Sequence, residues 1–287
     1  MRAGAVWVLV VGALASACGS GEVSGDAVFA GGATGGVGAG SGSGGSGSGG
    51  AAAGGGSGGG GGGLVLDAGG GASGGGGGSD FCGSALTGVV RDFRQDHPDF
   101  EDFLGTDHGI VTSTLGTDGK PIYAGDTPTT TGQASFDQWF RDVPGVNWAK
   151  PLTLQLVNTG GNDYTYEDDT FFPIDGELFG DEGNPHNYHF TFELRTAFVY
   201  TGGEVFTFTG DDDLFTYING RLAIDLGGVH GQQSDSIDLD ARASELGLTP
   251  GETYTLDFFF AERHTSESHF RIDTTIASFV NCGVVPE

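Results

Sequence analysis

Three consecutive carboxylates, Asp211, Asp212 and Asp213, form the most concentrated group of chemically capable side chains in the sequence. Neighbouring carboxylates repel one another, so a fold that brings them together needs a cation or partial protonation. Calcium suits them because it takes several oxygen ligands with loose geometry. Successive side chains of a regular strand point to opposite faces, so two adjacent Asp residues share an ion only where the backbone is bent. The triplet therefore predicts a Ca²⁺ site at a strained peptide, with a solvated acidic turn and no metal as the alternative.

Further ligands of this ion must come from a second loop. The polar stretch from Arg263 to Ser268 is the best candidate. Within it we expect Glu267 to be a metal ligand and His264 to be a ligand-binding residue. Asn219, in the Asn219-Gly220 turn, is the other expected ligand-binding residue.

Two other polar clusters are better explained without a metal. His186 and His189 have a spacing that could hold zinc on a helix, but their surroundings are those of a strand, so we expect a structural pair of histidines. Four acids in the segment 163–169 surround Tyr164 and Tyr166. This second cluster is expected to be a solvated loop, with another cation site as the alternative.

Motifs typical of enzymes are absent from the sequence. It has no Gly-x-Ser-x-Gly nucleophile elbow, no His-Glu-x-x-His and no phosphate-cradling loop. Paired carboxylates can hydrolyse glycosides, but adjacent Asp residues suit one ion better than two opposed faces of a sugar. We therefore expect a protein that is not an enzyme.

Alternating polar and apolar residues after Cys82 indicate strands. The clearest runs are 189–194, 205–209 and 254–260, and turn formers such as Asn219-Gly220 separate them. Each run is expected to bury one face. Many short strands with frequent turns predict an all-β fold, an antiparallel sandwich or barrel.

A few short helices and an aromatic core complete the expected domain. We expect the helices near Val89–Phe103 and Ala134–Arg141, before the main strands. Trp139, Trp148 and Tyr217 are expected to be core residues, with sugar-stacking platforms as the alternative.

The first residues have the pattern of an export signal. An apolar run from Ala3 to Leu14 is too short for a stable membrane anchor but suits the core of a signal peptide, residues 1–17. Leu14-Ala15-Ser16-Ala17-Cys18 resembles a bacterial lipobox, so Cys18 is the expected lipid anchor. An ordinary signal peptidase could cut the same bond, which leaves plain secretion as the alternative.

The three cysteines and the glycines divide the rest of the chain. Cys82 and Cys282 bracket the part that is not glycine-rich, and in an oxidising compartment their pairing as a disulfide leaves Cys18 free for the lipid. Residues 18–81 are nearly all Gly, Ser and Ala, which predicts a disordered linker because such a chain buries almost nothing. Residues 82–287 are then one folded domain.

The negative charge of the chain limits the classes of molecule that it is expected to bind. The formal net charge is −27, and most charged residues follow Cys82. Such a field repels nucleic acid and anionic lipid headgroups, whereas cations and neutral sugars are compatible with it. Contact with a membrane is expected only through the lipid anchor.

Several ordered motifs between residues 88 and 280 resemble the fibro-slime domain. They are His97-Pro98-Asp99-Phe100-Glu101, Phe136-Asp137-Gln138-Trp139-Phe140-Arg141-Asp142-Val143-Pro144-Gly145, Phe206-Thr207-Phe208-Thr209-Gly210-Asp211, Ile224-Asp225-Leu226-Gly227-Gly228 and Phe260-Ala261-Glu262-Arg263-His264. That family is similar to the protective-antigen-type β-sandwich of matrix proteins, adhesins and some glycosidases, which usually recognises carbohydrate. Yeast flocculin-type adhesins resemble this fold, and in them two consecutive Asp residues joined by a cis bond bind calcium, which coordinates sugar hydroxyls. The resemblance implies that Asp211 and Asp212 are this pair.

These observations together predict a cell-surface lipoprotein of the outer membrane, or a secreted protein, with a calcium-assisted carbohydrate-binding or adhesion domain. Its expected partner is an extracellular polysaccharide or surface glycan, in an extracellular matrix or slime. Two alternatives are a purely structural matrix protein without a discrete ligand and a glycan-processing enzyme.

Overall fold

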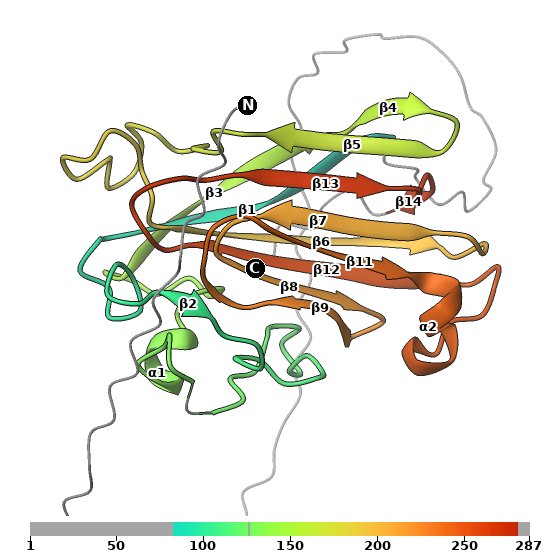
Figure 1. Ribbon diagram of the computed structural model, residues 1–287, viewed down its shortest axis with the longest axis horizontal. Coiled ribbons are helices and arrows are strands. Elements are labelled where there is room, and N and C mark those ends of the chain that lie inside the picture. Colours follow the sequence, from blue (N-terminus) through green and yellow to red (C-terminus); the bar gives the residue numbers. More distant parts are fainter. Residues whose placement is uncertain (1–82, 126, 281–287) are drawn as a thin grey trace, which may run out of the picture. The chain divides into compact units, whose positions relative to one another are not determined.

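Antiparallel strands make up most of the chain that the computed structural model describes, residues 83–125 and 127–280 (Figure 1). The two helices of this part, α1 (Gln133–Phe136) and α2 (Leu239–Leu246), are short. No helix in the described ranges is long and apolar enough to cross a membrane. The expected all-β class is confirmed. The predicted signal peptide and linker and all three cysteines (Cys18, Cys82 and Cys282) lie outside the described residues.

The strands form two large sheets. The larger one has seven strands, which are, in spatial order, β3 (Asn147–Gln155), β1 (Ala85–Phe93), β6 (Phe190–Val199), β12 (Thr253–Glu262), β8 (Asp213–Ile218) and β9 (Arg221–Leu226), with β14 (Phe279–Val280) paired to β6. The smaller one has five strands, β11 (Gln233–Asp238), β7 (Val205–Gly210), β13 (Phe270–Thr274), β5 (Asp163–Asp168) and β4 (Val157–Gly160). A two-stranded ladder joins β2 (Gly105–Thr106) to β10 (Gly228–Val229).

Aromatic side chains fill the space between the two large sheets. Phe258 and Phe260 of the larger sheet lie 5.5 and 5.2 Å, centroid to centroid, from the ring of Phe270 in the smaller one. Phe208 approaches the same ring edge-on at 5.2 Å. Each such ring removes about 150–250 Å² of surface from water, so this cluster is the main core of the sandwich.

A second core covers the outer face of the larger sheet. Trp139 and Phe140 belong to the covering segment 97–146, and Phe140 packs on Phe259 at 5.0 Å. The edge strand β3 is largely exposed, but the central strands β1, β6, β8 and β12 are mostly buried on both faces, and every residue of β8 is buried. The expectation of a single buried face is wrong for these strands because the sequence does not reveal that a long non-strand segment covers the sheet.

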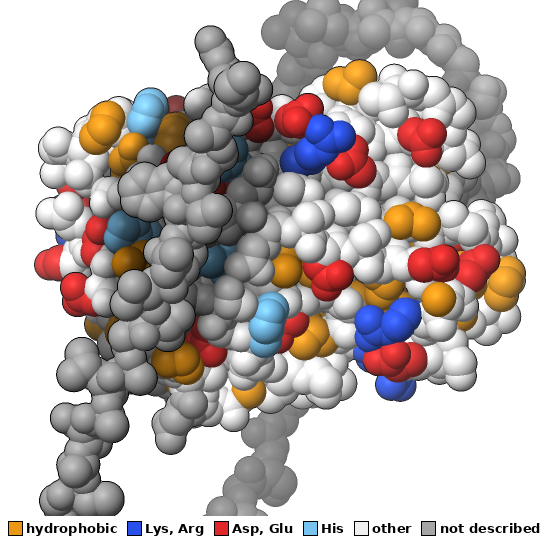
Figure 2. Space-filling view, viewed as in Figure 1, with side chains coloured by type: hydrophobic (Ala, Val, Ile, Leu, Met, Phe, Trp, Pro, Cys, Tyr) orange, Lys and Arg blue, Asp and Glu red, His pale blue; other side chains and the backbone are white. Residues whose placement is uncertain are grey.

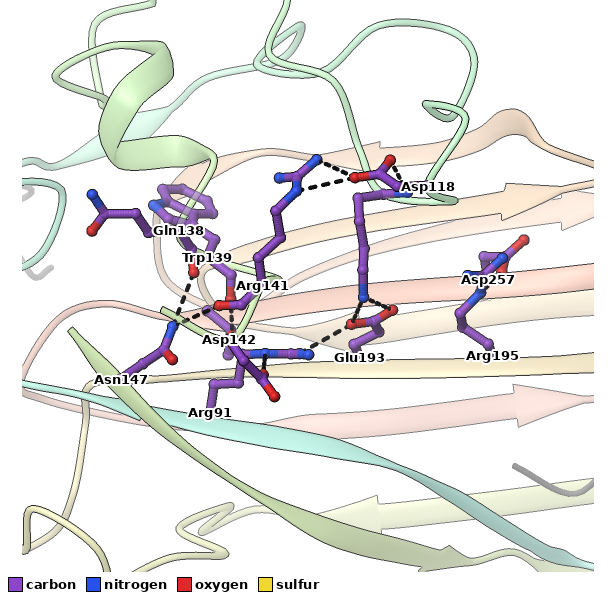
Figure 3. Close-up of polar contacts among 12 residues, drawn as sticks. Arg91, Asp118, Gln138, Trp139, Arg141, Asp142, Asn147, Glu193, Arg195 and Asp257 are labelled. Carbon is purple, nitrogen blue, oxygen red and sulfur yellow. Dashed lines mark hydrogen bonds and ion pairs between the residues drawn. The ribbon is translucent and has the colours of Figure 1, made fainter. Parts of the chain in front are cut away.

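A buried charge network fastens this covering segment to the sheet (Figure 3). Glu193 of β6 is fully buried, and both its carboxylate oxygens accept hydrogen bonds from Lys120 Nζ at 2.5 Å. Arg91 of β1 donates to the same carboxylate at 3.0 Å. A buried carboxylate with two cationic donors is compensated, so the network fixes where the segment lies on the sheet.

The expected helices are partly wrong. Residues 85–93 form strand β1, so the helix near Val89–Phe103 is not present. The helix near Ala134–Arg141 is confirmed in its first turn as α1. The sequence analysis missed α2, although Asp238 caps its first turn and Gly247, with φ of 71°, ends it.

Candidate functional site

The acidic triplet lies where the chain crosses from one sheet to the other. β7 ends at Gly210 in the smaller sheet, and β8 begins at Asp213 in the larger one. Gly210 permits a close approach, because a Cβ atom there would lie 2.5 Å from the carbonyl oxygen of His269. Asp212 has φ of 54°, a left-handed conformation that is costly for a non-glycine residue. The backbone is bent at this point, as a shared ion requires.

Asp211 and Asp212 are buried and held by backbone amides. The Asp211 carboxylate accepts hydrogen bonds from the amide of His269 at 2.5 Å and contacts His269 Nδ1 at 2.7 Å. The Asp212 carboxylate accepts from the amides of His230 at 3.1 Å and Arg263 at 2.8 Å. Each carboxylate oxygen has two lone pairs, so both groups keep capacity for a further ligand.

Asp213 has a different role from its two neighbours. Its carboxylate is fully buried, 2.6 Å from Nε of Arg263, and accepts a hydrogen bond from the amide of Gly228 at 2.7 Å. The Arg263 guanidinium lies 4.7 Å above the ring of Trp139 and donates to the carbonyl of Asp99. Asp213 does not line the cavity beside Asp211 and Asp212. The structure therefore separates it from the expected metal ligands.

Asn219 also lies away from the triplet. It follows the last residue of the six-residue strand β8, so about 20 Å of strand separates it from the acidic crossover. Its side-chain amide donates to the carbonyl of Leu246 at 2.8 Å. This contact fixes the β8–β9 turn on α2, and the structure does not bring Asn219 to the site.

The other predicted residues meet at one cavity of about 350 Å³. Its lining includes Asp211, Asp212, His264 and Glu267, together with residues of 104–106, 229–231 and Ser266. Ligand atoms of Asp211, Glu267 and His269 lie within 4.8 Å of one another. The sequence analysis thus identified four of the lining residues. His269, which with His264 flanks Glu267, was interpreted as part of a polar loop and was not among the predicted site residues.

Burial and mutual repulsion disfavour the charged forms of the carboxylates in this cluster. Burial raises the pKa of Asp212 to about 7, although Arg263 pulls it down. Burial, reinforced by the nearby Asp212 and Asp211 carboxylates, raises the pKa of Glu262 well above its ordinary value. Glu262 Oε2 is buried and has no hydrogen-bond partner among the described residues. Glu262 was not among the predicted site residues because it ends an apolar strand.

The basic groups near the cluster do not balance it. Arg263 is paired with Asp213, and the hydrogen bond to Asp211 raises the pKa of His269. On the face shown in Figure 2, acidic side chains are scattered and the few basic groups lie beside acidic ones. The cluster therefore contains more carboxylates than cationic partners, and a bound cation would favour the ionised forms of these carboxylates.

The two alternative clusters are structural. His186 and His189 each contact a carboxylate, those of Asp175 and Glu101, both at 2.6 Å. The acidic segment 163–169 is not a loop as expected, since most of it is strand β5, and Glu167 pairs with Arg271 at 2.6 Å.

The aromatic predictions are confirmed in two of three cases. Trp139 and Tyr217 are fully buried. Trp148 is 60 % exposed, so its assignment to the core is wrong. It lies on β3, the strand at the edge of the larger sheet, where nothing among the described residues covers its ring completely.

Comparison with known proteins gives a coarse class. Residues 161–284 match the model of the PA14 domain. Together with the antiparallel two-sheet architecture, this match supports a PA14-type β-sandwich. The narrower resemblance to the fibro-slime family stays a prediction.

Relatives in Dictyostelium discoideum are similar to most of the described domain. Protein psiR is 43% identical over 212 residues, which are 66% of this chain and 21% of psiR. Protein psiD is 41% identical over 202 residues, 63% of this chain and 39% of psiD. The chain therefore spans well under half of these relatives.

Two solved structures are similar at a low level. One is described as "PA14 sugar-binding domain from RTX adhesin", with 8% identity, a TM-score of 0.28, and coverage of 66% of this chain and 89% of that one. The other is the PA14 domain of the MpAFP antifreeze protein, with 8% identity, a TM-score of 0.30, and coverage of 71% and 94%. At these scores neither likeness carries an argument here.

Proposed function

We propose that the domain binds carbohydrate through a calcium ion held at the crossover between β7 and β8. One observation carries the proposal: the buried carboxylates of Asp211 and Asp212 line a cavity together with Glu267, and the buried cation beside them, Arg263, is already paired with Asp213. Asp211, Asp212 and Glu267 would hold the ion. When bound, calcium supplies open coordination positions that hydroxyl oxygens can fill.

The donor set fits a hard cation. The cavity offers carboxylate oxygens from both sides of the crossover, and their amide hydrogen bonds fix them before an ion binds. Ca²⁺ prefers such oxygen ligands, whereas zinc prefers imidazole and thiolate ligands. His269, whose ring nitrogen is grouped with the carboxylates of Asp211 and Glu267, is an imidazole donor of the kind that transition metals favour, so zinc is the comparison ion in the test.

The remaining cavity residues are placed to contact a bound ligand. His264 and Ser266 line the cavity from one side and His230 from the other. Neutral hydroxyl-bearing ligands suit these donors and acceptors, and the negative surroundings disfavour anions. The match to the PA14 model, a domain type associated with carbohydrate binding and adhesion, agrees with this ligand class.

The wider setting stays part of the proposal. We take the ligand to be an extracellular polysaccharide or surface glycan. A lipid anchor at Cys18 would hold the domain outside the cell, at the outer membrane. That residue lies outside the described ranges, so the anchor is supported only by the sequence pattern.

Calcium titration tests the metal site. Saturation at 100-fold above Kd stabilises a folded protein by about 2.7 kcal/mol. We expect a rise in Tm of about 5–10 °C for the wild-type chain. Removing two ligand charges in an Asp211→Asn/Asp212→Asn variant should abolish the rise, while Asp163→Asn, an exposed carboxylate on β5, should keep it. Equal shifts in the wild type and the double variant would falsify the site, and a response to zinc alone would exclude calcium.

Glycan binding tests the ligand class. A glycan array probed with calcium and then with a chelator should show signals that only calcium sustains. Absence of signal in both conditions would favour the structural matrix protein. Turnover of a matrix glycan by the pure protein would instead establish a glycan-processing enzyme.

A further inference from the structure

The loop 263–269 connects the larger sheet to the smaller one beside the acidic cavity. It follows β12 and leads into β13. Three of its residues line the cavity, His264, Ser266 and Glu267. A loop that supplies an ion ligand together with other polar groups must be held in one conformation for all of them to face the cavity at once.

The acidic pair fixes both ends of this loop. The amide of Arg263 donates a hydrogen bond to Asp212 at 2.8 Å, and the amide of His269 donates one to Asp211 at 2.5 Å. The residues between these two ends include all three that line the cavity. Their position therefore depends on a further anchor in the middle of the loop.

Glu101 is the anchor of the middle of the loop. Its Oε1 accepts a hydrogen bond from the amide of Thr265 at 2.9 Å, and its Oε2 accepts one from the Thr265 hydroxyl at 3.0 Å. The same Oε2 lies 4.0 Å from Nε2 of His264. The amide of Glu101 in turn donates to the carbonyl of Arg263 at 2.9 Å. One residue therefore binds the loop on both sides of His264.

The Glu101 carboxylate is itself held in place. His189, whose side chain is 3 % exposed, contacts its Oε1 through Nε2 at 2.6 Å. The ring of His189 stacks on Phe100, with centroids 6.1 Å apart and planes at 19°. Partial burial opposes ionisation, but the hydrogen bonds with His189 and Thr265 outweigh it and lower the pKa of Glu101. The side chain is therefore an oriented, ionised acceptor for the loop.

The backbone of Glu101 is strained as well. Its φ of 68° is a left-handed conformation that is unfavourable for a residue with a Cβ atom. Such strain persists where the surrounding contacts impose it, and it is common where a ligand is held. The chain then continues to Leu104 and β2, which also line the cavity. In Figure 1, β2 and the start of β13 lie on the same, left side of the view.

These contacts give Glu101 a role in the site, although it does not line the cavity. We propose that Glu101 is a positioning residue, which holds the loop 263–269 in the conformation that presents Glu267 to the ion. The inference rests on the proposed function for the identity of the ion. The bonds to Thr265 exist without an ion, so they can be tested separately.

Amide hydrogen exchange of the full-length chain in a chelator tests the anchoring of the loop. Glu101→Gly removes the side chain and also relieves the left-handed backbone, so this variant should fold. We expect the amide of Thr265 to exchange about tenfold faster or more in Glu101→Gly than in the wild type, with amides of β8 unchanged. Unchanged exchange at Thr265 would overturn the proposal. Faster exchange throughout β8 would also overturn it, because Glu101 would then stabilise the whole domain rather than the loop.

Calcium affinity, measured by calorimetric titration, separates positioning from charge. Glu101→Gln removes the charge but keeps an oxygen for the Thr265 amide and gains a donor to the Thr265 hydroxyl. Glu101→Gly should weaken calcium affinity about tenfold, whereas Glu101→Gln should retain most of it. Asp102→Asn, which neutralises the exposed neighbouring carboxylate, is the matched control and should bind calcium as the wild type does.

The outcomes distinguish this inference from the proposed function. Calcium binding that is as tight in Glu101→Gly as in the wild type would overturn the positioning role and leave the proposed function intact. Equal losses of affinity in Glu101→Gln and Glu101→Gly would mean that Glu101 acts through its charge, which also overturns positioning alone. A wild-type chain that binds no calcium would overturn the proposed function and the positioning role with it.

Discussion

Arg263 is the residue that makes the acidic crossover possible, because it neutralises Asp213. Replacing it by Met leaves that carboxylate buried without its partner, and removing one member of a buried pair costs about 3–5 kcal/mol. We expect the free energy of unfolding of Arg263→Met to fall by this amount in urea titrations. Arg263→Lys keeps the charge but loses the donors to the carbonyls of Asp99 and Thr129. Its free energy of unfolding should therefore lie between those of the wild type and Arg263→Met.

The double variant Arg263→Met/Asp213→Leu is the matched control. It removes both charges and retains comparable volume, so most of the lost stability should return. The single variant should also recover as the pH falls, because burial raises the pKa of Asp213 and protonation removes its charge. A double variant that is as unstable as the single one would show that Arg263 acts by packing on Trp139.

At the scale of single residues, the sequence predicts which side chains gather at the site but not which role each of them has. The bent crossover and the convergence of Asp211, Asp212, His264 and Glu267 follow from residue types and from a second polar loop. The distinct role of Asp213 does not follow, because it depends on where β8 begins and on a guanidinium that is 50 residues away along the chain. The sequence does not distinguish the three adjacent Asp residues, because their different contacts depend on the backbone conformation at the start of β8.

The segment 171–188 is attached to β1 by one buried carboxylate. Asp92 accepts hydrogen bonds from the amide of Phe179 at 2.6 Å and from Asn187 Nδ2 at 2.8 Å. Burial raises its pKa to about 6, against the opposing effect of these bonds. The folded state therefore binds more protons than the unfolded state between about pH 4 and 6, and stability falls as the pH rises through this window.

Asp92→Asn should remove that dependence. The two-unit shift corresponds to about 3 kcal/mol, so the variant should be more stable than the wild type at pH 7 by up to this amount and equal to it near pH 4. Urea unfolding across pH 4–7 measures the difference, with the exposed Asp96→Asn as the control. Lower stability of Asp92→Asn at pH 7 would mean that the ionic hydrogen bonds outweigh the burial cost.

Strands with regular alternation are the elements that the sequence predicts well. The runs 189–194, 205–209 and 254–260 lie in β6, β7 and β12 with small shifts at their ends. A helix was expected near Val89–Phe103, but the first part of this segment belongs to β1, which contains Arg91 and Asp92. Both are buried, since partners distant in sequence compensate them. Such partners are a tertiary property that local patterning does not contain.

At the scale of the whole molecule, the first and last described strands end on the same neighbour. β6 pairs with β1 through Phe190 to Glu193 and with β14 at Ala197 and Phe198. β1 pairs with β6 only as far as Val89 opposite Glu193, and β14 takes over at Ala197, four residues further along β6. The first and last described strands therefore share β6 as a neighbour, and the pairing of Cys82 with Cys282, both outside the described residues, stays a prediction.

Such a disulfide closes a loop of about 200 residues and would restrict the unfolded chain by about 5 kcal/mol in the entropy model. We expect Cys82→Ser/Cys282→Ser to unfold at a correspondingly lower urea concentration, with unchanged calcium response, because the acidic crossover is far along the chain from both cysteines. Thiol titration of the denatured, unreduced protein should find neither cysteine free. Two reactive thiols at these positions, or equal stability of the wild type and the double variant, would mean that strand pairing on β6 alone joins the ends of the domain.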